Sequence, residues 1–446
     1  MKRYKLLNNV LGWVVFVIAA VTYILTLEST ASFWDCGEFI ASGYKLEVGH
    51  PPGNPIFMLT ARFFANFASS PSEVAYMVNL MSGLLSAATI LLLFWTITRL
   101  AQKIVLRDGE TEETMSLGQM IAILGCGLVG ALAYAWSDTF WFSAVEGEVY
   151  AYSSFCTALV FWLILKWESV ADLPYANRYI ILIAYIIGVS IAVHLLNLLC
   201  IPAIVLVYYY RKYKNTDLKG SLIALLVSFV LIVLLLYGLV PGFVEVASWV
   251  ELLFVNVFHL PFNSGVVFYF FLIVGVIAWA IYETYAQRSD KLIKISFLIS
   301  IVLVGIPFIG DGYIIGIVLT AALAYYLFTR KKLAVVAMNT ILLSLFVIFI
   351  GYSSYALIVI RSTANTPMDQ NSPEDIFSLG GYLNREQYGD RPLFYGQTFP
   401  AEIARDANGT AISTKGKAIW KKRIIQKKSA FRFGNACLPL RALIGD

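Results

Sequence analysis

Apolar runs long enough to cross a lipid bilayer recur along most of this chain, and no other feature constrains its fold as strongly. Each run has roughly 17–25 residues, close to the length that a helix needs to span the hydrocarbon core. Apolar and polar residues do not alternate within the runs, as they would in the strands of a membrane barrel. Only 14% of the 446 residues are charged, against about 25% in soluble proteins. The sequence therefore predicts an all-α polytopic membrane protein.

Hydropathy predicts about eleven transmembrane helices. Their expected ranges are 10–27, 74–100, 118–136, 150–167, 178–194, 196–210, 221–240, 266–284, 292–309, 312–329 and 333–360. A further apolar segment, 55–67, is short and contains Arg62. We expect it to form an interfacial or re-entrant helix in the first outer loop.

Basic residues gather in the loops on one side of this arrangement, around 2–5, 99–107, 178, 211–219, 288–294 and 330–332. The positive-inside rule places this side, with the N-terminus, in the cytoplasm. We expect residues 1–360 to form the transmembrane domain. Residues 361–446 then follow an odd number of spans and form an extracytoplasmic tail, which could begin a truncated soluble domain.

The net charge of +5 is explained by these loops. No stripe of Lys and Arg alternates with exposed aromatic residues, so the composition gives no sign of a nucleic-acid partner. The sequence also lacks the phosphate-binding loop of ATPases, the HExxH zinc motif and the GxSxG nucleophile motif.

Two carboxylates and a histidine lie in the first outer loop. Ionisable groups at a membrane cost free energy, so their presence there indicates a function. Asp35 and Glu38 are three residues apart and share one face if the segment is helical. We predict that they are catalytic; the alternative is that Asp35 caps a helix. His50 precedes Pro51-Pro52-Gly53, a turn that ends the helix, and could bind a phosphate or only a backbone carbonyl.

The remaining candidates for binding the substrate or its phosphate lie near the same face. Glu146, Glu148 and Tyr150 precede or begin a span, where acids could also serve the helix N-terminus. His194 lies between two apolar runs and could equally make a packing hydrogen bond. Arg361 follows the last span, where its guanidinium suits a lipid phosphate but could also be a snorkelling anchor.

The motif Asp35-x-Gly-Glu38 followed by His50-Pro-Pro-Gly-x-Pro55 resembles the signature of the protein O-mannosyltransferase-like membrane glycosyltransferases of the GT-C type. The segments Glu146-x-Glu148-Val-Tyr150-Ala and 382–396 resemble the bacterial branch of that family. The resemblance implies a GT-C-type bundle whose first outer loop carries an essential aspartate, here Asp35, at a lipid-phosphate-sugar site. It also implies an integral protein of a bacterial inner membrane.

We therefore expect a glycosyltransferase that moves a sugar from a polyprenyl-phosphate donor to a hydroxyl of a protein or glycan. Its partners are the lipid-linked donor, the acceptor and membrane lipid. The spacing requires no cofactor, although a divalent metal could lie between the phosphate and the carboxylates. The alternatives are a transporter or flippase of a lipid-linked sugar and a non-catalytic envelope scaffold. A transporter would more typically show inverted repeats and ionisable groups near the midplane.

Overall fold

The computed structural model describes residues 2–107, 109–309, 313–330 and 332–389, and within these ranges every regular element is a helix. The longer elements, in chain order, are α1 (Lys2–Leu25), α2 (Cys36–Lys45), α3 (Pro55–Ala65), α4 (Val74–Val105), α5 (Leu117–Ala135), α6 (Asp138–Ala144), α7 (Val149–Val170), α8 (Asn177–Ile191), α9 (Ile201–Lys212), α10 (Leu218–Val233), α11 (Val240–Asn256), α12 (Ser264–Ala286), α13 (Asp290–Leu303), α14 (Tyr313–Thr329), α15 (Val335–Tyr352), α16 (Ala356–Thr363) and α17 (Ile376–Leu383). Most of the tail predicted over 361–446 lies outside the described residues.

Among the described residues, eight helices are long and apolar enough to cross a membrane. They run over Arg3–Leu25, Pro71–Val105, Leu117–Ala135, Val149–Val170, Leu195–Lys212, Leu218–Asn256, Ser264–Ala286 and Val335–Thr363. The three other predicted spans coincide with the shorter helices α8, α13 and α14. The prediction of an all-α polytopic membrane protein is confirmed, and the chain is an integral membrane protein.

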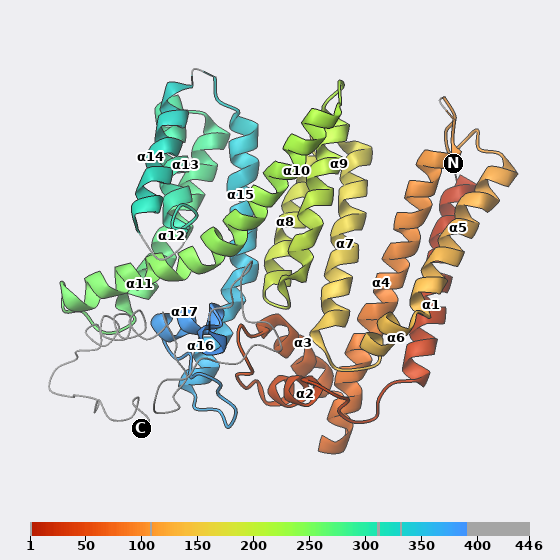
Figure 1. The fold of residues 1–446 in the computed structure, drawn as a ribbon, viewed down its shortest axis with the longest axis horizontal. Coiled ribbons are helices and arrows are strands. Elements are labelled where there is room, and N and C mark those ends of the chain that lie inside the picture. Colours follow the sequence, from red (N-terminus) through yellow and green to blue (C-terminus); the bar gives the residue numbers. More distant parts are fainter. Residues whose placement is uncertain (1, 108, 310–312, 331, 390–446) are drawn as a thin grey trace, which may run out of the picture.

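The long helices run side by side and form a bundle whose two ends carry different elements (Figure 1). The short helices α2, α3, α16 and α17 gather at one end, and the N-terminus lies at the other. The N-terminal end also holds the basic loops after α4 and α9. The separation of basic loops from surface helices agrees with the two faces expected from the sequence.

The two helices of the first outer loop form as their sequence predicts. Helix α2 ends where Leu46 adopts a left-handed conformation, with φ of 53°. Helix α3 begins with Pro55, whose fixed φ and missing N–H suit a first helical position. With 11 residues, α3 is about 16 Å long, roughly half the thickness of the hydrocarbon core. It is therefore too short to cross.

The segment after the span predicted at 221–240 differs from our expectation. The spans predicted at 221–240 and 266–284 leave Glu245, Trp249 and Glu251 in the loop between them, but these residues lie on α11, which continues from α10 through a π-helical turn at Leu234–Leu239. Pro241 lies in the first turn of α11, where the wider turn accommodates its missing N–H. Glu251 accepts hydrogen bonds from the backbone N–H groups of Asn263 and Val266, which ties α11 to the start of α12.

Two glycines allow α8 and α15 to approach closely. A Cβ atom on Gly188 would lie 2.7 Å from the Cα atom of Ile348, and one on Gly351 would lie 2.4 Å from the carbonyl carbon of Gly188. Both contacts involve backbone, which cannot rotate away as a side chain can. The α8–α15 pair therefore depends on the absence of side chains at these two positions.

We expect Gly188→Ala to lower the unfolding free energy by about 1–3 kcal/mol, because the new methyl group overpacks a rigid contact. The measurement is the thermal midpoint of the purified protein in detergent. Gly275→Ala on α12 is the matched control, since nothing lies within 4 Å of the added atom. Equal midpoints for the two variants would contradict the close approach of α8 and α15.

Candidate active site

The N-terminus of α2 holds the first candidate residue, Asp35, in an exposed position. Asp35 is the residue before the helix, yet its side chain makes no capping hydrogen bond. The described part of the chain provides no hydrogen bond or ion pair for its carboxylate. The capping explanation therefore fails for Asp35, and its oxygen atoms are available to a ligand.

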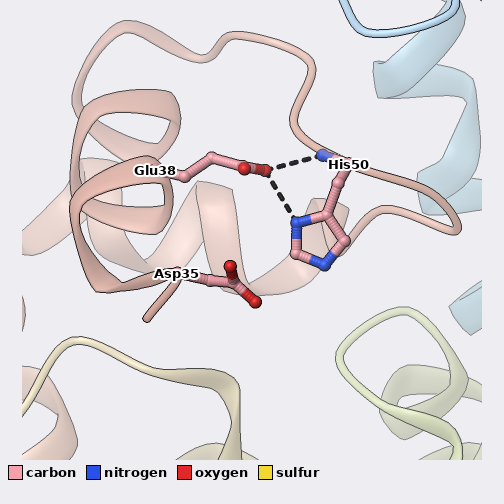
Figure 2. A group of neighbouring side chains, drawn as sticks. All are labelled: Asp35, Glu38 and His50. Carbon is pink, nitrogen blue, oxygen red and sulfur yellow. Dashed lines mark hydrogen bonds and ion pairs between the residues drawn. The ribbon is translucent and has the colours of Figure 1, made fainter. Parts of the chain in front are cut away.

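Glu38 lies one helical turn further along the chain, on α2, and links this helix to the loop that carries His50. One oxygen of Glu38 accepts hydrogen bonds from the backbone N–H of His50 at 2.6 Å and from His50 Nδ1 at 2.8 Å. The other oxygen accepts a hydrogen bond from Gln370 Nε2 at 3.3 Å. Figure 2 shows the carboxylate of Asp35 directed toward the same imidazole. These contacts bring Asp35, Glu38 and His50 into one group.

The ion pair shifts the pKa of both of its members. The hydrogen bond that His50 donates to Glu38 raises the pKa of His50, with further support from the charges of Glu38 and Asp35, although burial opposes this. Burial alone would raise the pKa of Glu38, but the hydrogen bonds and charge of His50 lower it overall. The raised pKa favours the protonated form of His50, and therefore a positive charge, beside Asp35.

The same three side chains fit the donor set of a divalent cation. Carboxylate oxygens and an imidazole nitrogen are common protein ligands of zinc and other divalent metals. One ligand atom from each of Asp35, Glu38 and His50 lies within 4.8 Å of the others. The group is therefore compact enough for one ion.

A C-terminal segment holds the turn that carries His50. Tyr382 is 1% exposed, and its hydroxyl donates to the carbonyls of Gly49 at 2.7 Å and His50 at 3.3 Å. The backbone of Val48 pairs with residues 368 and 370 on both sides of Asp369. The position of His50 thus depends on residues more than 300 positions later in the chain.

We expect Tyr382→Phe to lower the unfolding free energy by about 1–3 kcal/mol, because the buried Gly49 carbonyl loses its partner. Hydrogen exchange of the backbone around Gly49 should become faster in this variant. Tyr388→Phe is the control, since Tyr388 is 43% exposed. Unchanged exchange at Gly49 would show that Tyr382 does not hold the turn.

Arg361 belongs to this C-terminal segment as well. Its Nε donates to the carbonyl of Leu46 at 2.5 Å and an Nη donates to that of Lys45 at 3.3 Å. Arg361 therefore satisfies the C-terminus of α2. Its predicted contact with a lipid phosphate remains a prediction.

The second outer loop brings two more carboxylates to α2. Glu146 is 4% exposed, and its side chain hydrogen-bonds to Ser32 and Cys36. Glu148 is 5% exposed and accepts a hydrogen bond from the backbone of Val149, the first residue of α7. The capping role considered for Glu148 is therefore observed. Glu148 also interacts electrostatically with Asp35 and Glu146, so the two outer loops share one site.

Burial raises the pKa of Glu148 to about 7, and repulsion by Glu146 and Asp35 adds to the effect. Folding is therefore penalised once pH exceeds the unfolded pKa of 4.5, and the penalty is complete above about pH 7. We expect Glu148→Gln to be as stable as the wild type at pH 4 and more stable at pH 8, by up to about 3 kcal/mol. Thermal midpoints measured across this range provide the test.

Glu113→Gln changes an exposed acid at the opposite end of the bundle and is the control for this comparison. It should shift the midpoint equally at both pH values. A Glu148→Gln variant that gains no stability at high pH would contradict the raised pKa.

Tyr150 and His194 lie together at the edge of this group. Their ring centroids are 5.5 Å apart, and Tyr150 interacts electrostatically with Asp35 and Glu148. His194 Nδ1 accepts a hydrogen bond from the backbone N–H of Leu196, so His194 caps the short helix that follows; this contact differs from the packing hydrogen bond considered for it. Its second ring nitrogen remains a candidate for a substrate contact.

Sequence reasoning missed one member of the site, Gln370. A single glutamine in a polar, proline-containing segment carries no local signal of its contact with Glu38. Tyr382 was predicted only as the first residue of the segment 382–396 that resembles the family. Its hydrogen bonds to the turn that carries His50 were not predicted.

Comparisons with known proteins cover this region of the chain. Residues 35–217 match the family model of the protein O-mannosyl-transferase TMEM260 N-terminal domain. The protein O-mannosyl-transferase TMEM260 of Mus musculus is 27% identical over 209 residues, which are 47% of this chain and 27% of the mouse protein. The tmem260 protein O-mannosyl-transferase of Dictyostelium discoideum is 23% identical over 149 residues, covering 33% and 16% of the two chains. No solved structure matches the chain.

The aligned region spans about a quarter or less of these relatives. The family model, which matches residues 35–217, covers Asp35, Glu38 and His50 and also Glu146 and Glu148. These residues lie within one group in the structure. The resemblance predicted from the motifs is confirmed: the region that carries the candidate site matches the protein O-mannosyl-transferase TMEM260 N-terminal domain.

Proposed function

We propose that this chain is a GT-C-type glycosyltransferase that moves a sugar from a polyprenyl-phosphate donor to a hydroxyl group on the extracytoplasmic face. The observation that carries the proposal is the free carboxylate of Asp35 beside the Glu38–His50 pair. The names of the relatives favour mannose as the sugar and a protein side chain as the acceptor. The alternative acceptor is a hydroxyl group on a glycan.

In the proposed reaction, the acceptor oxygen forms a bond to C1 of the sugar while the bond from C1 to the phosphate oxygen breaks. Asp35 takes the proton of the acceptor hydroxyl, as a positioned general base does. The phosphate leaves with the lipid and carries the electron pair of the broken bond. Protonated His50 lies on the same side and would stabilise the charge that develops on that phosphate. Glu38 keeps the imidazole oriented and protonated.

The proposed donor needs an apolar surface beside these charges. Helix α3 follows the histidine turn and exposes Leu59 and Phe63, with Phe67 just beyond its end; these side chains are 43%, 58% and 60% exposed. A polyprenyl chain resting on this surface would hold its phosphate near Asp35. Binding energy from the lipid would then position the reacting bond.

A divalent cation, if the enzyme uses one, would be held by Asp35, Glu38 and His50, whose donor atoms fit it. When bound, it would supply positive charge for the phosphate. In that case His50 would bind the cation as a neutral imidazole, and the charge on the phosphate would be stabilised by the cation instead of by protonated His50.

We place the site outside the cytoplasm and the basic loops inside, following the positive-inside rule. In this orientation the N-terminus is cytoplasmic and the C-terminal segment is extracytoplasmic. A bacterial inner membrane is the proposed location.

The proposal is tested with the purified full chain in liposomes, using labelled polyprenyl-phosphate mannose and a peptide rich in Ser and Thr. Labelled peptide is the expected product. Movement of the labelled donor across the bilayer without a new glycosidic bond would instead identify a transporter or flippase. If a monodisperse and folded preparation gives no labelled peptide and moves no donor, both activities are rejected.

A further inference from the structure

A second polar cavity lies at the opposite end of the bundle from Asp35. Helices α1, α4 and α7 enclose a volume of about 420 Å³, within the size range of small-molecule sites. Its lining includes Lys5 and Asn8 from α1, Arg99 from α4, and Lys166 from α7. This is the N-terminal end in Figure 1, far from α2 and α3.

The lining has an excess of positive charge. Lys5, Arg99 and Lys166 face a single carboxylate, that of Glu112. Glu112 pairs with Lys5 at 3.7 Å, whereas Arg99 donates to the neutral amide of Gln102. Among the described residues neither Arg99 nor Lys166 has an acidic partner within ion-pair distance. Neither of them therefore forms an ion pair with the described residues, and the lining sets three cationic side chains against the one carboxylate of Glu112.

These cations are close enough to affect one another. Lys166 interacts electrostatically with Arg99 and Lys5, which repel it, and with Glu112, which attracts it. Its ammonium group lies 4.9 Å from the ring centre of Trp162. Like charges held together in a partly enclosed site are costly without an anion. A bound anion would remove this cost.

The cavity also has an unused hydrogen-bond acceptor. The Oδ1 atom of Asn8 is buried and has no partner among the described residues. The Glu112 carboxylate is a second acceptor in the same lining. A ligand that fits both features carries an anionic group and, next to it, a hydroxyl or ammonium donor.

We propose that this cavity binds a phosphate ester that also carries a hydroxyl or ammonium group. A guanidinium matches two phosphate oxygens at once, and basic pockets between transmembrane helices at the cytoplasmic side suit lipid head groups. Helix α1 exposes Leu6, Val10 and Trp13 near the turns that carry Lys5 and Asn8. A phospholipid could therefore lie against α1 and place its head group in the cavity. A soluble phosphate ester has the same chemistry and is the second source. The proposal does not depend on the glycosyltransferase activity.

Binding is measured on the full chain, purified in phosphate-free detergent, by native mass spectrometry and thermal unfolding. The probes are phosphatidylglycerol, phosphatidylcholine and glycerol 3-phosphate. We expect phosphatidylglycerol to bind the wild type more tightly than phosphatidylcholine and to raise its thermal midpoint. Stabilisation by glycerol 3-phosphate but not by phosphatidylglycerol would support a soluble ligand for the same site.

The double variant Arg99→Gln, Lys166→Gln should bind the preferred probe at least about tenfold more weakly. Asn9→Trp keeps every charge and fills the cavity from α1, so it should also abolish binding even if the double variant fails to fold. Lys291→Gln, an exposed lysine on α13 outside the cavity, is the control and should bind normally. Phosphatidylcholine is the negative probe, because its quaternary ammonium has no hydrogen to donate and its head group has no net charge. The proposal is overturned if the wild type prefers neither phosphatidylglycerol nor glycerol 3-phosphate to phosphatidylcholine, or if the Asn9→Trp variant binds as well as the wild type.

Discussion

Replacing Asp35 with asparagine is expected to lower the rate of sugar transfer by about 10²- to 10⁴-fold, the usual contribution of a positioned general base. Asparagine has the same size but cannot take the acceptor proton at neutral pH. The Asp35 side chain is exposed and makes no capping hydrogen bond. Its loss should therefore change the unfolding free energy by no more than about 0.5 kcal/mol. The measurements are initial rates of labelled-sugar transfer and thermal midpoints.

Asp138→Asn is the matched control. Asp138 is also exposed and begins a short helix, α6, but it belongs to none of the groups described above. It should transfer sugar at the wild-type rate. An Asp35→Asn variant as active as Asp138→Asn would end the mechanism proposed here.

The second large effect is expected for Glu38→Gln, which should slow transfer by about 10- to 100-fold. Each hydrogen bond to a charged group contributes about 1.5–3 kcal/mol, and about 1.4 kcal/mol corresponds to a factor of ten in rate. Glu38 accepts two hydrogen bonds from His50 and one from Gln370. Glutamine cannot replace the charge that favours the protonated form of His50.

The same variant should change the dependence of stability on pH. The pKa of Glu38 is lowered from 4.5 and that of His50 is raised from 6.5, so the ion pair is complete between these two values. The stability that Glu38 confers is lost as pH falls through its lowered pKa. The stability that His50 confers is lost as pH rises through its raised pKa. The wild type should therefore exceed Glu38→Gln in thermal midpoint most strongly between pH 4.5 and 6.5.

Glu374→Gln is the control for Glu38, because Glu374 is exposed and lies in the C-terminal segment at the same end of the bundle. Its rate and pH profile should match those of the wild type. A Glu38→Gln variant with the same pH profile as Glu374→Gln would show that the Glu38–His50 pair is not formed in solution.

Local rules predicted the part of the fold that holds the site. The run of apolar residues before Leu27 predicted the first span. The Asp35–Glu38 spacing predicted two neighbouring acids, which lie just before α2 and in its first turn. Pro55 marked the start of α3, because proline favours the first helical position. These features depend on neighbours within a few residues, which the sequence displays directly.

Features that depend on distant residues could not be predicted in this way. The apolar run predicted a span that ends at residue 240, but a π-helical turn allows α10 to continue into α11. The hydrogen bond from Arg361 to the end of α2 was not predicted, and its contact with a lipid phosphate stays a prediction. The contact of Gln370 with Glu38 joins positions 332 residues apart. Tertiary packing decides each of these outcomes.

The central claim is that α2 and α3 present Asp35 to the sugar–phosphate bond of a lipid-linked donor. It is tested most directly by photo-cross-linking the full chain in nanodiscs to a polyprenyl-phosphate mannose whose first isoprene unit carries a diazirine. The account predicts that mass spectrometry finds the label on residues 33–67 and that unlabelled donor competes it away. Competed labelling confined to other helices, with none on this segment, would contradict it.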